Sequence, residues 1–465
     1  MSRFRMAVAG LVGSFLLLTC LASCGEQGSD SSVPVETGPL RDKAEAHDRW
    51  VEKWHTPNYG SHLHVRFTDA AREEVDTYHG HGDSCIWTGT YVGTQALRYR
   101  VTGDPQARAN VIRSIDALTR HLDVTGRDGF IARYVGQVDN PGHRAVVAGC
   151  EAEDRCHLVT EGPFADHFWV GHTSRDQYTG WFLGMAWAYD TVDDAGMRAQ
   201  IQSNVTRVLD RLIADDWLII DVDGRPSQKA PNVLPPMQMA WALIGYHVTG
   251  EQRFMDVFAS WAAPDKRLVL ILNNISKLNQ YHQHYGLNLA HENFLSLLRL
   301  SRIYDPETHA FLQTIFREQT HRVVHLQHNP WYTAVFLAEG GLDPAERLPY
   351  REQIIENLTD FPPAPKFQFG MVPPPPAELD PISVALHELQ QEFPILRDIM
   401  GTVNLQAAEA YPVRYQCSSG FMFQRSMWAI SCDIEEDRPE HVDSGHDYLA
   451  AYWLASAYGV LGPDD

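Results

Sequence analysis

The feature that most constrains the fold is a repeated pattern in the first half of the chain. Residues 87–99 open with Trp-Thr-Gly, residues 178–189 open with Tyr-Thr-Gly, and in both a second glycine follows four positions after the first. Each segment is apolar, ends at a break with acidic residues or glycine, and precedes a more polar stretch, 106–122 or 196–213. Apolar residues recur there every three or four positions, as on one face of a helix. The pattern predicts hairpins that pair an apolar helix with a half-exposed one.

The same pairing continues towards the C-terminus, where further apolar segments alternate with more polar ones. With about 40–50 residues in each pair, roughly six pairs fit into the chain. The apolar helices carry small residues, which favours a closely packed inner ring with an outer ring around it. The helices expected beyond the first two pairs are 43–54, 234–249, 285–304, 330–358, 384–400 and 444–458.

On this pattern the chain resembles the (α/α)6 toroids, the six-hairpin fold of many carbohydrate-active proteins, over about residues 45–458. Unsaturated uronyl hydrolases, sugar epimerases and several polysaccharide lyases share this fold. The resemblance implies an all-α fold class and a glycan or oligosaccharide ligand. It rests on helix periodicity and aromatic content; the uronyl hydrolases' pattern around the catalytic aspartate and the lyases' Asn-His pairing are not reproduced. It therefore implies no single reaction.

Two stretches are not expected to be helical. Residues 411–433 alternate between polar and apolar side chains, which predicts a small β-hairpin on the toroid. Residues 361–380 hold several prolines, including the run 373–376, and proline favours extended backbone there. This second stretch is either a surface connection or a rim that narrows one mouth of the toroid.

The first 24 residues predict export and lipidation. Arg3 and Arg5 precede an apolar run, 6–21, as in a signal peptide. Residues 21–24, Leu-Ala-Ser-Cys, resemble the lipobox of bacterial lipoproteins, which implies cleavage before Cys24 and a diacylglyceryl group on its sulfur. The alternative is an ordinary secretory signal. The predicted domains are a signal peptide (1–23), a lipidated flexible tether (24–42) and the toroid (43–465).

This reading places the protein in the bacterial cell envelope, outside the cytoplasm, with the lipid bilayer as a partner through Cys24. In a cell with two membranes, it places the protein at the outer one. The net charge of −21 argues against nucleic acid as a partner, because so acidic a surface repels phosphate.

The cysteines predict disulfides, as expected outside the cytoplasm. Cys150 and Cys156 enclose a short polar loop and are expected to pair, and Cys417 and Cys432 flank the predicted hairpin. Cys85 is left over, and its place in an apolar helix predicts a buried small side chain rather than a nucleophile.

Polar residues recur just before several of the predicted inner helices. In a toroid these helix ends line one mouth, so chemistry is expected there. The segments are 79–84, 172–178, 281–286 and 441–447. Asp and Ser at such places are also common N-caps, which is the structural alternative for them.

Asp176 is the favoured catalytic carboxylate. Arg175 beside it and the N-terminal end of the helix would keep it ionised, as a general base must be. Asp83 precedes the first repeat, and together the two could form the carboxylate pair of glycoside hydrolysis. The alternative is two unrelated capping acids.

A second cluster contains His284 and Tyr285. A neutral His or Tyr can abstract the proton next to a uronate carboxyl group, which is the chemistry of a lyase. The alternative is a polar helix entrance with structural hydrogen bonds. The pairs His79/His81 and His282/His284 are too weak a pattern to predict a metal, and no cofactor is expected.

Substrate contacts are expected from aromatic and polar residues near the same mouth. Trp87 and Tyr178 could stack on sugar rings, although most aromatics in a helical protein belong to the core. Asn329 is either an N-cap or a hydrogen-bonding partner of the substrate. The predicted binding residues are Arg175, Tyr178, Trp87, His446 and Asn329.

The function predicted from these observations is that of a surface-anchored, carbohydrate-active enzyme of glycoside hydrolase type. A polysaccharide lyase of the same fold and a non-catalytic lipoprotein that binds a glycan or a protein are the alternatives.

Overall fold

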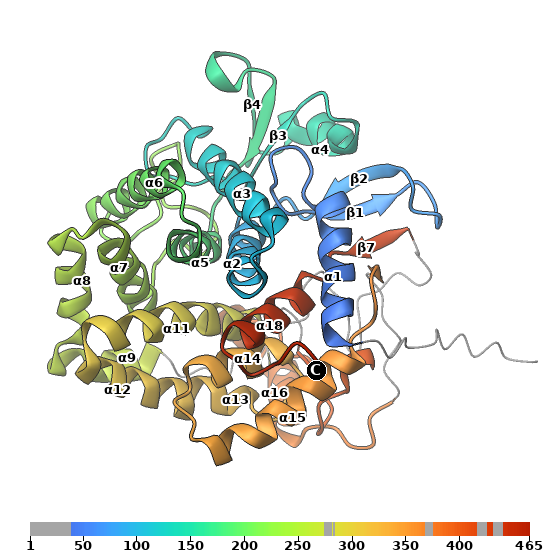
Figure 1. The fold of residues 1–465 in the computed structure, drawn as a ribbon, viewed down its shortest axis with the longest axis vertical. Coiled ribbons are helices and arrows are strands. Elements are labelled where there is room, and N and C mark those ends of the chain that lie inside the picture. The colour runs from blue at the N-terminus through green and yellow to red at the C-terminus, as the bar shows by residue number, and fades with distance from the viewer. Residues whose placement is uncertain (1–38, 274–280, 282–283, 368–374, 416–425, 431–439) are drawn as a thin grey trace, which may run out of the picture. The chain divides into compact units, whose positions relative to one another are not determined.

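A computed structural model describes residues 39–273, 281, 284–367, 375–415, 426–430 and 440–465 (Figure 1). These residues belong to one compact unit, Glu36–Asp465. The predicted signal peptide, Cys24 and most of the tether lie outside them, so cleavage and lipidation stay predictions. None of the described helices is long and apolar enough to cross a membrane.

Among the described residues, six largely buried helices form an inner ring. Each packs against the next along the chain, and α18 packs against α2, so the ring is closed (Figure 1). The inner helices are α2 (Ser84–Thr102), α5 (Arg175–Thr191), α7 (Pro235–Thr249), α11 (Tyr285–Tyr304), α14 (Pro330–Glu339) and α18 (His446–Ala457).

A second helix packs outside each of these. In α3, for example, Val111, Ile115, Leu118 and Leu122 are buried while the opposite face is open to solvent. The outer helices are α1 (Leu40–Trp50), α3 (Pro105–Asp123), α6 (Ala195–Ala214), α8 (Gln252–Ala262), α12 (Pro306–Ile315) and α15 (Pro344–Asp360). The predicted all-α, (α/α)6 fold class is confirmed.

Shorter helices connect these elements. The α-helical ones are α4 (Arg144–Gly149), α9 (Arg267–Asn273), α13 (Arg322–Val324), α16 (Pro381–Glu392) and α17 (Ile395–Met400). The 3-10 and π segments are η1 (Val51–His55), η2 (Pro141–His143), η3 (Cys150–Ala152), η4 (Gly162–Phe164), η5 (Pro264–Lys266), η6 (Phe316–His321) and η7 (Val413–Tyr415).

The repeated glycines explain the closest contact in the ring, between α2 and α5. A Cβ atom on Gly89 would lie 2.0 Å from the carbonyl oxygen of Gly180, and one on Gly180 would lie 2.2 Å from that of Ile86. Only glycine permits this approach of two backbones. The sequence repeat is therefore the interface between two neighbouring inner helices.

A buried polar network joins the two ends of the chain where the ring closes. Asp48 of α1 accepts hydrogen bonds from Gln95 of α2 at 2.6 Å and from the indole of Trp453 of α18 at 2.9 Å. Arg98 lies 3.3 Å from the same carboxylate. Burial raises the pKa of Asp48 to about 6, although Arg98 opposes this shift.

Two small antiparallel sheets lie at the N-terminal end of the inner ring. The first has the order β2-β1-β7-β6 and the second the order β3-β5-β4. Their strands are β1 (His64–Phe67), β2 (Val75–His79), β3 (Tyr134–Gln137), β4 (Cys156–Val159), β5 (His167–Val170), β6 (Lys366–Phe367) and β7 (His441–Asp443). Because β2, β5 and β7 lead into α2, α5 and α18, the sheets position the loops before those helices.

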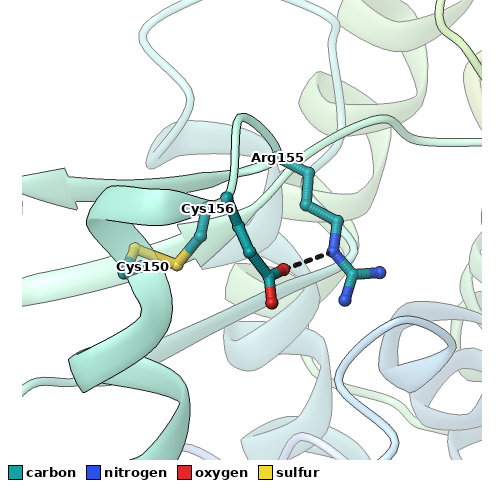
Figure 2. The surroundings of a disulfide bond; sticks show 4 residues. Cys150, Arg155 and Cys156 are labelled. Carbon is teal, nitrogen blue, oxygen red and sulfur yellow. Dashed lines mark hydrogen bonds and ion pairs between the residues drawn. A yellow bond between two sulfur atoms is a disulfide. The ribbon is translucent and has the colours of Figure 1, made fainter.

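The disulfide Cys150–Cys156 is present, with a Cα–Cα distance of 4.9 Å, and it joins η3 to the start of β4 (Figure 2). Cys85 is buried and unpaired, as predicted. Cys417 and Cys432 lie outside the described residues, as does most of the predicted hairpin. Within 411–433, the described part forms η7 and a bridge from Ala429 to Gln406.

Candidate active site

Two carboxylates stand at the N-terminal ends of neighbouring inner helices. Asp83 directly precedes α2, and Asp176 is the second residue of α5. Because α2 and α5 pack so closely at their glycines, both carboxylates reach the same end of the ring. They are near enough for the charge of Asp176 to act on Asp83.

Asp83 occupies the N-cap position of α2 but does not cap the helix with its side chain. Its Oδ1 atom instead accepts a hydrogen bond from the amide of Gln177 at 3.1 Å, and the guanidinium of Arg133 lies 3.5 Å away. The capping alternative therefore does not account for this carboxylate. Its hydrogen bond joins the start of α2 to the start of α5.

The Asp83 side chain is 48% exposed, yet protein surrounds it closely. Burial raises the pKa of its carboxyl group, Arg133 opposes the shift, and the charge of Asp176 adds to it. An accessible carboxyl group with a raised pKa suits a general acid.

Asp176 is half-buried, and no donor among the described residues hydrogen-bonds its carboxylate. Its charge acts on four neighbours, Asp83, Arg133, Tyr285 and Glu292. Arg175 beside it donates to the carbonyl oxygen of Asn232 at 3.0 Å. Asp176 is thus held near other titratable groups and keeps its oxygens available.

Tyr285 begins α11 and is 47% exposed. Burial of part of the ring raises the pKa of its phenol, Asp176 and Asp83 raise it further, and Arg175 opposes them. Three residues predicted from the sequence, Asp83, Asp176 and Arg175, therefore lie within electrostatic reach of a fourth, Tyr285.

Sequence reasoning missed Arg133, Gln177 and Glu292. Arg133 lies just before β3, and Gln177 follows Asp176 in α5. Glu292 lies inside α11, where it accepts a hydrogen bond from Asn288 at 2.8 Å. Burial raises the pKa of Glu292 to about 8, Asn288 opposes this, and Asp176 adds to it. A glutamate within an apolar helix was the available signal for this residue.

The predicted histidines of the site are buried rather than accessible. His284 is 6% exposed, and burial lowers its pKa to about 3. His446 is fully buried, with Nε2 at 3.2 Å from the hydroxyl of Thr90, and burial likewise lowers its pKa to about 3. Burial and the lowered pKa make both imidazoles poor acceptors for a proton from a substrate.

The predicted stacking residues belong to the core. Trp87 is 3% exposed and Tyr178 is 1% exposed, and the ring of Tyr178 stacks on Trp241 at 6.0 Å. Asn329 caps α14, since its Oδ1 atom accepts a hydrogen bond from the backbone of Trp331 at 3.0 Å. All three side chains are buried.

The predicted histidine pair His79/His81 makes its ring contacts with different partners. The ring centroid of His79 lies 5.4 Å from that of His64, and the ring centroid of His81 lies 5.4 Å from that of His143. Among the described residues, no group of three His, Cys, Asp or Glu side chains could hold a metal ion.

Comparisons with known proteins give structural likenesses alone. No family model and no curated protein matches the sequence. The crystal structure of the cellulase Cel9M of C. cellulolyticum aligns with a TM-score of 0.42 at 12% identity, over 90% of this chain and 98% of that one. The catalytic domain of Clostridium thermocellum CelT aligns with a TM-score of 0.42 at 10% identity, over 90% of this chain and 96% of that one. A Bacteroides ovatus GH9 protein aligns with a TM-score of 0.38 at 10% identity, over 91% of this chain and 83% of that one.

Proposed function

We propose that this chain is a glycoside hydrolase that acts on a glycan or oligosaccharide outside the cytoplasm, with Asp83 and Asp176 as its catalytic pair. The observation that carries the proposal is the pair itself. Two accessible carboxylates from adjacent inner helices lie at one end of the ring, close enough to influence each other. Glycoside hydrolysis uses two such carboxyl groups on opposite sides of the scissile bond.

The two carboxyl groups take different roles in this proposal. Asp83, whose pKa is raised, protonates the oxygen of the leaving sugar. Asp176, whose oxygens accept no hydrogen bond from the described residues, attacks the anomeric carbon or activates water. Tyr285, half-exposed beside them, offers a ring face on which a sugar can stack.

A lyase is the weaker alternative. His284 is buried, and the phenol of Tyr285 has a raised pKa, so neither is a ready base at neutral pH. A non-catalytic glycan-binding protein would need no pair of coupled carboxylates.

The test is to incubate the unit Glu36–Asp465 with bacterial, algal and plant polysaccharides and with unsaturated oligomers, and to follow reducing ends and ultraviolet absorbance together. New reducing ends without new absorbance mean hydrolysis. A rise in absorbance means elimination and contradicts the assignment. Binding without any product on the same substrates favours the non-catalytic alternative.

We also propose that lipidated Cys24 anchors the enzyme to the cell envelope. The support is the sequence pattern of residues 21–24. Labelling cells with a radioactive fatty acid tests it: the wild-type protein should carry label and sediment with membranes, and Cys24→Ser should do neither. Equal labelling of both would contradict the anchor.

A further inference from the structure

We infer that Arg133 is the positioning residue of the carboxylate pair: it ties together the loops that carry Asp83 and Asp176 and faces Asp83 with a positive charge. The inference rests on the proposed function for its catalytic consequence, but its structural part can be measured without a substrate.

One guanidinium group contacts both loops. Its Nη1 atom donates to the carbonyl oxygen of Gly82 and lies 3.5 Å from the carboxylate of Asp83. Its Nε atom donates to the carbonyl oxygen of His172 at 2.9 Å, and Nη2 donates to the hydroxyl of Ser174 at 2.8 Å. Gly82 directly precedes Asp83, and Ser174 lies two positions before Asp176.

The backbone of Arg133 is fixed as well. Its N–H donates to the carbonyl oxygen of Val170 at 2.8 Å, which extends the pairing of β3 with β5. The residue is 8% exposed. The guanidinium therefore projects from a sheet into the space between two loops, and it cannot follow one loop without pulling on the other.

The chemistry of arginine suits this place. The planar guanidinium offers five donors spread over three nitrogens in a rigid fork, whereas the three donors of lysine all radiate from one nitrogen. Its charge also opposes the shift that burial imposes on the pKa of Asp83. Arg133 thus has two separable effects, one geometric and one electrostatic.

These effects separate in three variants. Arg133→Met removes both, Arg133→Lys keeps the charge, and Ser174→Ala keeps the guanidinium but removes one of its anchors. Arg98→Met is the matched control, because Arg98 is also 8% exposed and pairs with acids, but at the closure of the ring.

With a substrate, Arg133→Met should lower kcat about tenfold or more while KM changes less than about threefold, since orientation of the reacting groups is lost. Loss of the Arg133 charge raises the pKa of Asp83 in this variant. Because Asp83 must be protonated to act as the general acid, the alkaline limb of the pH–rate profile should move to higher pH. Arg133→Lys should keep that limb near its wild-type position with a reduced kcat, and Ser174→Ala should lower kcat less. Arg98→Met should leave the shape of the profile unchanged.

Without a substrate, thermal unfolding of the full chain is followed from pH 4 to pH 7 in a cycle with Asp83→Asn. In Arg133→Met the ionised Asp83 has lost its counter-charge, so stability should fall more as pH rises, and Asp83→Asn should abolish this extra fall. In the Arg98→Met background, Asp83→Asn should act as it does in the wild type.

Equal effects of Asp83→Asn in all backgrounds would overturn the inference even if the enzyme is active. If only the proposed function is wrong, the result differs. The wild type then forms no product on any substrate, while the energetic coupling between Asp83 and Arg133 is still measured in the unfolding cycle. A pH–rate profile of Arg133→Met that matches that of Arg98→Met would refute the catalytic consequence.

Discussion

Replacing Gly180 with alanine tests the contact that brings the two carboxylates together. The added Cβ would lie 2.2 Å from the carbonyl oxygen of Ile86, whereas ordinary contacts begin near 3.4 Å. The obstacle is helix backbone, which cannot turn aside as a side chain can. Helices α2 and α5 must therefore move apart by about 1 Å to accept the methyl group.

The expected magnitude follows from two opposing terms. Overpacking a tight interior costs about 1–3 kcal/mol, and the rigid obstacle places this substitution at the upper end. Alanine regains about 1 kcal/mol of helix propensity over glycine. Gly180→Ala should therefore lose about 2 kcal/mol of unfolding free energy and also weaken the bond between Gln177 and Asp83.

Gly93 provides the matched control on the same interface. A Cβ atom there would lie 3.4 Å from the indole of Trp187, close to ordinary contact. Gly93→Ala should be neutral or stabilise by up to about 1 kcal/mol. Urea unfolding monitored by circular dichroism measures both variants. If Gly180→Ala is as stable as Gly93→Ala, the account of the repeat as a close helix contact is refuted.

Three further predictions concern other parts of the unit. Asp48→Ala should cost about 1–3 kcal/mol in urea unfolding for each of the two buried donors, Gln95 and Trp453, that it leaves without an acceptor. Asp193→Ala, which removes an exposed ion pair, should stay within about 0.5 kcal/mol; similar losses would contradict the closure network. The pKa of Glu292 is raised to about 8 in the folded state, so its contribution to stability is present below its unfolded pKa and is lost progressively as pH rises from that value to about 8. Glu292→Gln should therefore raise the melting temperature at pH 8 relative to wild type and less so at pH 5, and a gain that does not grow with pH would argue against a protonated side chain. Replacing Cys150 and Cys156 together with serine should cost about 2–3 kcal/mol relative to the oxidised wild-type protein, measured by thermal unfolding. Reduction of the wild-type protein should destabilise it to the same extent, and a double variant as stable as the oxidised wild type would contradict this role of the disulfide.

The helices could be predicted because their signals are local. Residues 285–304 were expected to be one helix, and α11 has these bounds. The glycine pattern of 87–99 and 178–189 predicts close packing, but it does not predict that the two repeats pack on each other. The gathering of Asp83 and Asp176 followed from hairpin topology, because inner helices that alternate with outer ones start at the same end.

The rest of the site depends on contacts between residues far apart in the sequence. Arg133 meets Asp83 and Ser174 through the pairing of β3 with β5, and no local pattern marks it for that role. The burial of Trp87 and Tyr178 has a different cause. A shift of one position turns a helical side chain by about 100°. This rotation decides whether an aromatic side chain points to the opening of the helix ring or to the neighbouring helix.

The most direct test of the central claim is the turnover of Asp176→Asn and Asp83→Asn beside the wild type on the glycan panel. The account predicts that the wild type releases reducing ends without unsaturated products. Each variant should lose at least about 100-fold in kcat, as expected when a catalytic acid or base is removed, and should melt within a few degrees of the wild type. Full activity in Asp176→Asn, or unsaturated products from the wild type, would contradict the assignment of this carboxylate pair.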